Sequence, residues 1–361
     1  MAENKLGNFV KIKTGKLDAN ASSLDGKYPF FTCSKQSLKI NSYSYDCKCV
    51  LVAGNGDLNV KYFEGKFDAY QRTYIIQSKD ESILDNRYLY WFLFKYVEKL
   101  RELSIGGVIK YIKLNNLTDP VISLPTLEMQ KKIVKILDDA DSLRKKRAQT
   151  ITLLDDYLKS VFEEIFGDPV INLKQWKKEL LKNSIEIQSG QVDPKAEPYS
   201  SMIHIGGADI ESKTGKIINK ITAKDADQIS GKYLFNENYI LYSKIRPYLN
   251  KVSLPKFSGI CSADIYPIKP KNLLNKYFLA FILRSDGFVE YANKNSGRAN
   301  IPKINRFDLL KYEIIVPPIN LQEKFEQIWR KVDIIEKKMG TQAEQLEEQF
   351  QSIMQKIFKS A

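Results

Sequence analysis

The sequence predicts an α+β fold in which a mixed α/β domain followed by a long helix occurs twice in tandem. Three features predict it: a repeated Pro-x-x-x-x-Gln pattern, two long stretches of helical apolar periodicity, and short strand-like runs separated by turn residues. We expect two mixed α/β domains in a pseudo-two-fold tandem repeat, separated by two long helices that form an antiparallel coiled coil.

The repeat is visible in residue register. Pro125 and Pro317 stand 192 positions apart, and the same offset aligns Ile112 with Ile304. Further identities at this offset are Ser104 with Ser296, Ile109 with Ile301, Leu117 with Leu309, Ile122 with Ile314, Lys132 with Lys324 and Asp141 with Asp333. Upstream, Gly15 corresponds to Gly190 at a shorter offset of 175, so the second copy carries an insertion within its globular part.

The globular part of each copy is predicted over residues 1–122 and 168–314, a normal size for a domain. Runs rich in β-branched and aromatic residues predict strands, and a Gly-Asn-Gly-Asp sequence at residues 54–57 predicts a hairpin turn. Helical spacing of apolar residues predicts helices at residues 88–103 and 276–294. The predicted strands include residues 50–53, 74–77 and 239–242.

The second part of each copy, residues 123–167 and 315–361, is predicted to be a long spacer helix. Apolar residues recur at alternating steps of three and four, which places an apolar seam along one face. Prolines precede each helix, and Gly167-Asp168-Pro169 ends the first. A helix of about 38 residues is roughly 57 Å long at 1.5 Å per residue. Antiparallel pairing buries both seams; the alternative is that each helix packs only on its own domain.

The chain of 361 residues is basic, with 56 Lys+Arg against 43 Asp+Glu, a net charge of +13 and a pI near 9.2. An excess of this size indicates a polyanionic partner, although scattered surface lysines would give the same total. No apolar run approaches the roughly 20 residues that span a bilayer, and the first residues lack the apolar core of a signal peptide. We therefore expect a cytoplasmic protein with no membrane partner.

Common catalytic signatures are missing from the sequence. The four cysteines form no CxxC pair and His204 is the only histidine, which disfavours zinc and His-based nucleophile systems. No G-x-G-x-x-G or GxxxxGK[ST] occurs, and Pro317-Pro318 lacks the aromatic residue of a methyltransferase motif. Asp57 with Glu64-Gly65-Lys66 resembles a nuclease metal site, but the second copy lacks it. We predict no catalytic residues, no metal site and no enzyme activity for the chain alone.

Several loops mix basic, amide and aromatic residues, the set that suits DNA. Arginine can bind a guanine edge bidentately, and glutamine or asparagine an adenine edge, whereas lysine and tyrosine suit phosphates. Each single residue could equally be a solvated surface group. The candidate DNA-binding residues are Lys35, Asn55, Tyr70, Gln71, Arg72, Lys110 and Tyr111 in the first copy, and Lys244, Arg246, Tyr248, Asn250, Arg298, Asn300 and Lys303 in the second.

Taken along the whole chain, this layout resembles the specificity subunits of type I restriction-modification systems. The order is domain, Pro-x-x-x-x-Gln helix, domain, Pro-x-x-x-x-Gln helix, and residues 167–169 with Asn172 and Trp176 look like the family's junction after the first helix. Residues 28–34 and 69–73 resemble one common type of target recognition domain, and residues 243–249 resemble another. Together these matches are specific, whereas the Pro-x-x-x-x-Gln pattern alone is weak.

The resemblance implies that each domain is a target recognition domain for one half of a split site in double-stranded DNA. Because the two domains differ in sequence, the whole site is expected to be asymmetric. The helices would set the gap and dock two methyltransferase subunits, through which restriction subunits join. S-adenosylmethionine, ATP and Mg²⁺ would belong to those partners and not to this chain. The alternatives are a non-catalytic coiled-coil adaptor that does not bind DNA and a stand-alone metal-dependent nuclease.

Overall fold

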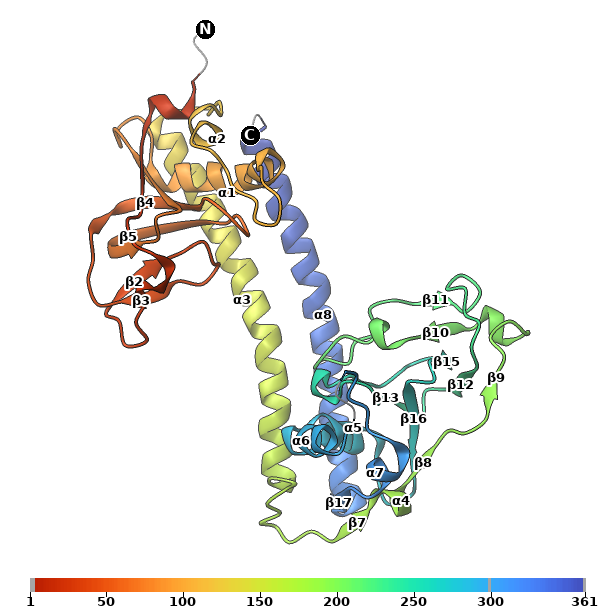
Figure 1. The fold of residues 1–361 in the computed structure, drawn as a ribbon. Coiled ribbons are helices and arrows are strands. Elements are labelled where there is room, and N and C mark those ends of the chain that lie inside the picture. The colour runs from red at the N-terminus through yellow and green to blue at the C-terminus, as the bar shows by residue number, and fades with distance from the viewer. Residues whose placement is uncertain (1–3, 298–299, 360–361) are drawn as a thin grey trace. The chain divides into compact units, whose positions relative to one another are not determined.

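The structure, a computed structural model, describes residues 4–297 and 300–359 and divides into two compact units (Figure 1). Unit 1 comprises residues 1–150 and 339–361, and unit 2 comprises residues 151–338. Two long helices, α3 (Leu127–Phe166) and α8 (Ile319–Ile357), contribute to both units. We call the rest of unit 1 head 1 and the rest of unit 2 head 2. The division of the chain at residues 122, 167 and 314 stays a prediction.

Head 1 is built on one six-stranded sheet with the order β1-β6-β4-β5-β2-β3. Its neighbours are antiparallel except for β2 and β5, which run parallel. The hairpin predicted at residues 54–57 is confirmed, because the segment joins β4 to its antiparallel partner β5. The elements are η1 (Leu6–Asn8), β1 (Val10–Thr14), η2 (Ala19–Ala21), β2 (Tyr28–Phe31), β3 (Leu38–Ile40), β4 (Tyr45–Ala53), β5 (Val60–Ala69), β6 (Thr73–Ser78), α1 (Asn86–Leu103) and α2 (Asn115–Thr118).

Helix α1 joins the sheet of head 1 to the long helices. Asp85 caps its N-terminus by accepting from the backbone N–H groups of Arg87 and Tyr88, which supports the predicted helix. One face of α1 packs on the sheet, and the same apolar cluster includes Leu137 of α3 and Phe350 of α8. Arg87 donates to Asp138 of α3 through Nε (2.9 Å) and forms an ion pair through Nη2 (2.8 Å). These contacts fix head 1 to the part of the helices within its own unit.

Head 2 divides its strands among three sheets. A five-stranded sheet has the order β11-β10-β15-β12-β9, a four-stranded sheet has the order β14-β13-β16-β8, and β17 pairs with β7. The strands are β7 (Lys178–Leu180), β8 (Ile185–Ile187), β9 (Gln191–Val192), β10 (Ile203–Ile205), β11 (Ile221–Thr222), β12 (Lys232–Phe235), β13 (Ile240–Ser243), β14 (Val252–Ser253), β15 (Gly259–Cys261), β16 (Ile265–Pro270) and β17 (Glu313–Ile315). The helical elements are α4 (Leu181–Ser184), η3 (Tyr199–Ser201), η4 (Gly207–Asp209), η5 (Pro247–Leu249), α5 (Lys276–Arg284), α6 (Asp286–Lys294) and α7 (Arg306–Leu310).

The prediction of a single helix at residues 276–294 is wrong in one respect. This segment forms two helices, α5 and α6, which meet at Ser285. Ser285 has extended backbone angles, φ −64° and ψ 149°, and its hydroxyl accepts from the backbone N–H of Phe288 to cap α6. Serine competes for backbone donors in this way, which favours a helix start over a helix interior. The periodic apolar pattern continues across the break and conceals it.

Within unit 2, α3 and α8 run in opposite chain directions. Burial, then the negative charge of Glu336 of α8, raises the pKa of Asp155 of α3, and the ring of Phe162 of α3 lies 5.3 Å from that of Phe325 of α8. As α3 advances from Asp155 to Phe162, its neighbours on α8 therefore move toward the start of α8, which is the antiparallel arrangement predicted from the seams. In unit 1, Arg144 of α3 pairs with Glu347 of α8. Among the described residues, no helix has both the length and the apolar content needed to cross a membrane.

The repeated Pro-x-x-x-x-Gln pattern has a physical explanation in a buried glutamine. Gln130 is 0% exposed; its Oε1 accepts from the backbone N–H of Asp85 (2.9 Å) and its Nε2 donates to the carbonyl oxygens of Ile83 (2.8 Å) and Pro125 (2.9 Å). In unit 2, Gln322 is also 0% exposed, and its amide makes the same three kinds of contact. Its partners are Asn275 N–H at 2.8 Å, Leu273 O at 3.1 Å and Pro317 O at 2.7 Å. The glutamine therefore ties each long helix to the loop that precedes the helix of its head.

Candidate nucleic-acid interface

One edge of head 1 brings together three segments that the sequence analysis selected separately. They are the end of β4, the β5–β6 turn and residues 105–112. Gly54 N–H donates to the carbonyl of Arg72 (2.8 Å), and Ile112 N–H donates to the carbonyl of Gly54 (2.9 Å). Asn55 forms an isolated bridge with Tyr111. Backbone hydrogen bonds therefore hold these loops in fixed register, which is what a recognition surface requires.

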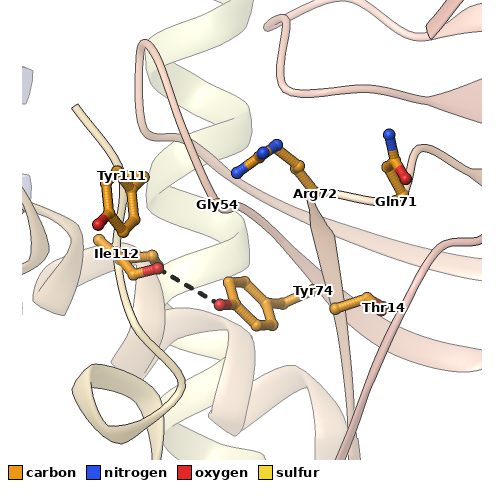
Figure 2. Close-up of a pocket in the computed structure, with 7 residues that line it drawn as sticks. All are labelled: Thr14, Gly54, Gln71, Arg72, Tyr74, Tyr111 and Ile112. Atoms are coloured by element: carbon orange, nitrogen blue, oxygen red, sulfur yellow. Dashed lines mark hydrogen bonds between the residues drawn. The ribbon is translucent and has the colours of Figure 1, made fainter. Parts of the chain in front are cut away.

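A pocket of about 270 Å³ opens at this edge (Figure 2). The Tyr74 hydroxyl closes one side by donating to the carbonyl of Ile112 (3.3 Å). Gly54 lies at the centre, where a Cβ atom would be 2.4 Å from the carbonyl oxygen of Arg72, so no other residue fits without moving the turn. The lining residues are Thr14, Gly54, Gln71, Arg72, Tyr74, Tyr111 and Ile112.

The side chains of Gln71 and Arg72 both line this pocket, but in the part of the chain that the structure describes only that of Gln71 is held by a hydrogen bond within the protein. The Gln71 Nε2 donates to Asp18 Oδ1 (2.7 Å), so the carboxylate orients the amide. Figure 2 shows the Arg72 side chain extending toward the side of the pocket where Tyr111 lies. Within residues 4–297 and 300–359, no hydrogen bond or ion pair engages the Arg72 guanidinium, and the residue is exposed. A guanidinium in this state has all five donors available for a ligand.

The remaining candidates of head 1 occupy the same edge or its surroundings. Tyr70 precedes Gln71 in the β5–β6 turn and is half-buried, whereas Lys110 is exposed and its carbonyl accepts from Gly56 N–H (2.9 Å). Lys35 lies in the β2–β3 turn and forms an exposed ion pair with Asp57 (3.1 Å). The structure thus brings Asn55, Tyr70, Gln71, Arg72, Lys110 and Tyr111 to one edge and places Lys35 on a neighbouring turn. Their DNA contacts stay predictions.

Head 2 builds the same backbone edge from different residues. Lys244 N–H donates to the carbonyl of Asp264 (3.0 Å), and Ile304 N–H donates to the carbonyl of Lys244 (3.0 Å). Ile245 forms a bridge with Lys303, as Asn55 does with Tyr111 in head 1. Gly56 and Arg246 also correspond, since both have positive φ, 68° and 48°, and they donate their N–H groups to the carbonyl oxygens of Lys110 (2.9 Å) and Pro302 (2.7 Å) respectively.

Charged side chains gather at this edge of head 2. The Lys244 side chain is buried, and its Nζ donates to the carbonyl of Ala263. The same Nζ lies 4.9 Å from the centre of the Tyr266 ring and 3.8 Å from Asp264 Oδ1. Lys303 Nζ lies 3.9 Å from the same Asp264 oxygen. Burial, then the positive charge of Lys303, lowers the pKa of the Lys244 amine, and Asp264 opposes this shift. Asp264 therefore lies between two lysines with part of its carboxylate exposed.

The other candidates of head 2 have different surroundings. Arg246 and Tyr248 are exposed at the turn around η5. Asn250 has a left-handed backbone (φ 49°), and its Nδ2 donates to the carbonyl of Arg284 (2.7 Å), so its amide is partly engaged within the protein. Asn300 is exposed, and Arg298 lies outside the described residues.

Two acidic residues at these edges escaped the sequence analysis, Asp18 and Asp264. Basic, amide and aromatic residues were the candidates because they suit an anionic partner, and this criterion rejects carboxylates. A usable signal was nevertheless present: the 192-residue offset of the repeat places Arg72 on Asp264. The residues that resembled a nuclease site take separate partners, since Asp57 pairs with Lys35 and Glu64 pairs with Lys48 (3.3 Å). In the described part of the chain, no group of three or more His, Cys, Asp or Glu side chains could hold a metal ion.

Comparison with known proteins identifies relatives over nearly the whole chain. Residues 1–153 and 174–348 match the family model described as the type I restriction modification DNA specificity domain. The type I restriction enzyme EcoDI specificity subunit of Escherichia coli is 33% identical over 393 aligned residues, covering 98% of this chain and 87% of that protein. The MjaVIII specificity subunit of Methanocaldococcus jannaschii is 24% identical, covering 97% of this chain and 90% of that protein.

Solved structures show the same fold. The S subunit of a type I restriction-modification system from M. genitalium superposes with a TM-score of 0.65 at 15% identity, covering 99% of this chain and 95% of that one. A chain from a study of complex assembly and conformational transition of the type I R-M system has a TM-score of 0.53 at 15% identity, covering 98% and 96%. The predicted α+β fold, with two tandem domains and two long helices, is confirmed.

Proposed function

The chain belongs to the type I restriction-modification DNA specificity family, and we propose that its two heads read the two halves of a split, asymmetric DNA site. Its relatives are specificity subunits, the non-catalytic components of type I systems, and recognition of DNA sequence is the role of this domain. The predicted identity as a specificity subunit is therefore confirmed. The split site and its asymmetry are the proposal.

The observation that carries this proposal is the matching edge in the two heads. Each head uses a backbone hydrogen bond from the end of a strand to the turn before the next strand, at Gly54 in head 1 and at Lys244 in head 2. Each edge then presents its own set of polar side chains. Two similar surfaces with different chemistry suit two different half-sites. A net charge of +13 supplies the sequence-independent attraction to phosphates.

We also propose that the long helices dock two methyltransferase subunits, through which restriction subunits join. Apolar side chains on α3 and α8 remain exposed within each unit, for example Ile136 (52%) in unit 1, and Leu153 (62%) and Ile334 (71%) in unit 2. Exposed apolar residues in rows along a helix are typical of a surface that a partner covers. S-adenosylmethionine, ATP and Mg²⁺ would then be bound by these partners.

The test is to co-express the chain with the methyltransferase subunit of its own system and map methylated adenines across the host genome. We expect one split motif with unlike halves, methylated only when both proteins are present. Methylation at that motif without this chain would contradict the proposal. So would a purified complex whose affinity for DNA does not fall with salt, because a protein that contacts several phosphates loses affinity steeply as salt rises.

A further inference from the structure

The two recognition edges share a frame that goes beyond a similar chain path. Tyr74 and Tyr266 occupy the same position, since each pairs with the penultimate residue of the central strand, Val52 in head 1 and Tyr242 in head 2. Ile112 and Ile304 also correspond, because each donates its N–H to the residue just after that strand. Both isoleucines are buried, at 3% and 0% exposure. These residues hold the edge together in both heads.

The other residues at corresponding positions of this edge differ in kind. Where head 1 has Gly54, head 2 has Lys244, and where head 1 has Arg72, head 2 has Asp264. The bridge partners differ as well, with Tyr111 in head 1 and Lys303 in head 2. The arginine-to-aspartate difference is the sharpest, because it replaces a group that only donates hydrogen bonds by one that only accepts them.

This difference separates reading of bases from binding of phosphates. A position used for phosphate contact in both heads needs a hydrogen-bond donor in both and does not suit a carboxylate, since every phosphate is negative whatever the sequence. Asp264 would repel a phosphate at the place where Arg72 would attract one. A position that reads a base edge has no such requirement, because base edges present donors in some cases and acceptors in others. A backbone frame that is the same in both heads, with a donor side chain in one head and an acceptor in the other, is therefore typical of a specificity-determining position.

We propose that Arg72 and Asp264 are equivalent specificity-determining residues, Arg72 donating to the O6 and N7 of a guanine and Asp264 accepting from the exocyclic amino group of a cytosine. The assignment rests on the proposed function, since it requires that the heads read half-sites. Bidentate donation to guanine is the commonest specific contact of arginine, and carboxylates accept from the cytosine N4 group.

The surroundings of each residue fit these roles. In head 1, the pocket at Gly54 leaves space beside the unengaged guanidinium for the edge of a base pair, and Gln71, oriented by Asp18, lies next to it. In head 2, Lys244 stands at the position of Gly54, and its side chain is directed to the carbonyl of Ala263. Lys244 Nζ and Lys303 Nζ lie 3.8 Å and 3.9 Å from Asp264 Oδ1, and their positive charges would offset the repulsion between this carboxylate and the DNA backbone.

The experiment compares Arg72→Ala and Arg72→Lys with the wild-type chain, each co-expressed with the methyltransferase subunit, by mapping methylated adenines. In Arg72→Ala, one base pair of the half-site read by head 1 should become degenerate, with discrimination there falling roughly tenfold to a hundredfold. Arg72→Lys keeps the charge but loses the planar pair of donors, so the same base pair should relax. Loss of specificity in the charge-preserving variant separates base reading from a general loss of charge.

Lys110→Ala is the matched control, because Lys110 is an exposed cation on the same edge. As a phosphate contact it should weaken binding to all sequences equally and lower the salt slope by about one. Asp264→Asn tests the other head: it should change the preference at one base pair of the second half-site and leave the first half-site intact. Thermal unfolding of each purified complex checks that the variants are folded.

The outcomes distinguish this inference from the proposed function. If the wild-type chain directs methylation to a split motif and both Arg72 variants keep every base of that motif, Arg72 does not read a base and the inference is wrong. The same holds if Arg72→Ala weakens all sites evenly while Arg72→Lys restores them, which is the behaviour of a phosphate contact. If the wild-type chain directs no split motif, the proposed function itself fails.

Discussion

Replacing Gln130 by alanine should destabilise unit 1 far more than the loss of one polar side chain on a helix suggests. The amide of Gln130 is 0% exposed and makes three hydrogen bonds, to Asp85 N–H and to the carbonyl oxygens of Ile83 and Pro125. In Gln130→Ala, one donor and two acceptors of the buried backbone lose their partner. An unsatisfied buried group costs roughly 1–3 kcal/mol, so three cost about 3 kcal/mol or more where water cannot reach them.

Gln130→Glu should be worse at neutral pH, because its carboxylate would face two carbonyl oxygens without a proton to share. The control is Gln349→Ala, since Gln349 is exposed on α8, and its effect should stay within about 0.5 kcal/mol. Gln322→Ala is the corresponding change in unit 2.

The assay is denaturant unfolding of the full chain combined with hydrogen exchange at peptide resolution. Gln130→Ala should accelerate exchange around residues 83–89, where the Asp85 amide loses its acceptor, and leave residues 273–279 unchanged. Gln322→Ala should do the reverse. If Gln130→Ala shifted the unfolding free energy no more than Gln349→Ala, or accelerated exchange equally in both segments, the explanation of the repeated glutamine would be wrong.

Three further predictions concern head 1 and the helices. Asp138→Ala removes the acceptor of Arg87 and of the Trp91 indole N–H (2.9 Å), and because this ion pair is partly exposed we expect a loss of about 1–2 kcal/mol, measured by urea unfolding. Gly54→Ala places a Cβ atom 2.4 Å from the Arg72 carbonyl, so it should displace the β5–β6 turn and weaken DNA binding by the complex in a filter or anisotropy assay, with little change in helix content by circular dichroism. Inserting one heptad after Thr150 of α3 and another after residue 339 of α8 should lengthen the gap of the methylated motif without altering either half; an unchanged gap would refute the helices as a ruler.

The tandem fold could be predicted because its signals are periodic and repeated. The offset between Pro125 and Pro317 fixes the register of the copies, and apolar spacing over some forty residues has few interpretations other than a long helix. The break at Ser285 escaped prediction because helix caps depend on one side chain and leave the apolar period intact. The role of Gln130 and Gln322 was also hidden, since a pattern of spacing does not reveal which backbone groups a side chain satisfies.

The candidate interface was predictable in position and less so in detail. The β5–β6 turn and residues 110–111 of head 1 were predicted from the sequence, and in the structure they lie at one edge. Lys244 was also predicted, but it lies buried with its amine directed at a backbone carbonyl. Asp264 was missed because carboxylates do not suit an anionic partner, although the 192-residue offset of the repeat aligns Asp264 with Arg72. Residues of this kind are identified only when the two heads are compared position by position.

The most direct test of the account is to exchange residues 190–307 of head 2 for the matching segment of another specificity subunit and map the methylated motif. The account predicts that one half-site changes to that of the donor protein, while the other half-site and the gap stay as in the wild-type chain. A change in both half-sites, or in neither, would contradict the claim that each head reads its own half of the site.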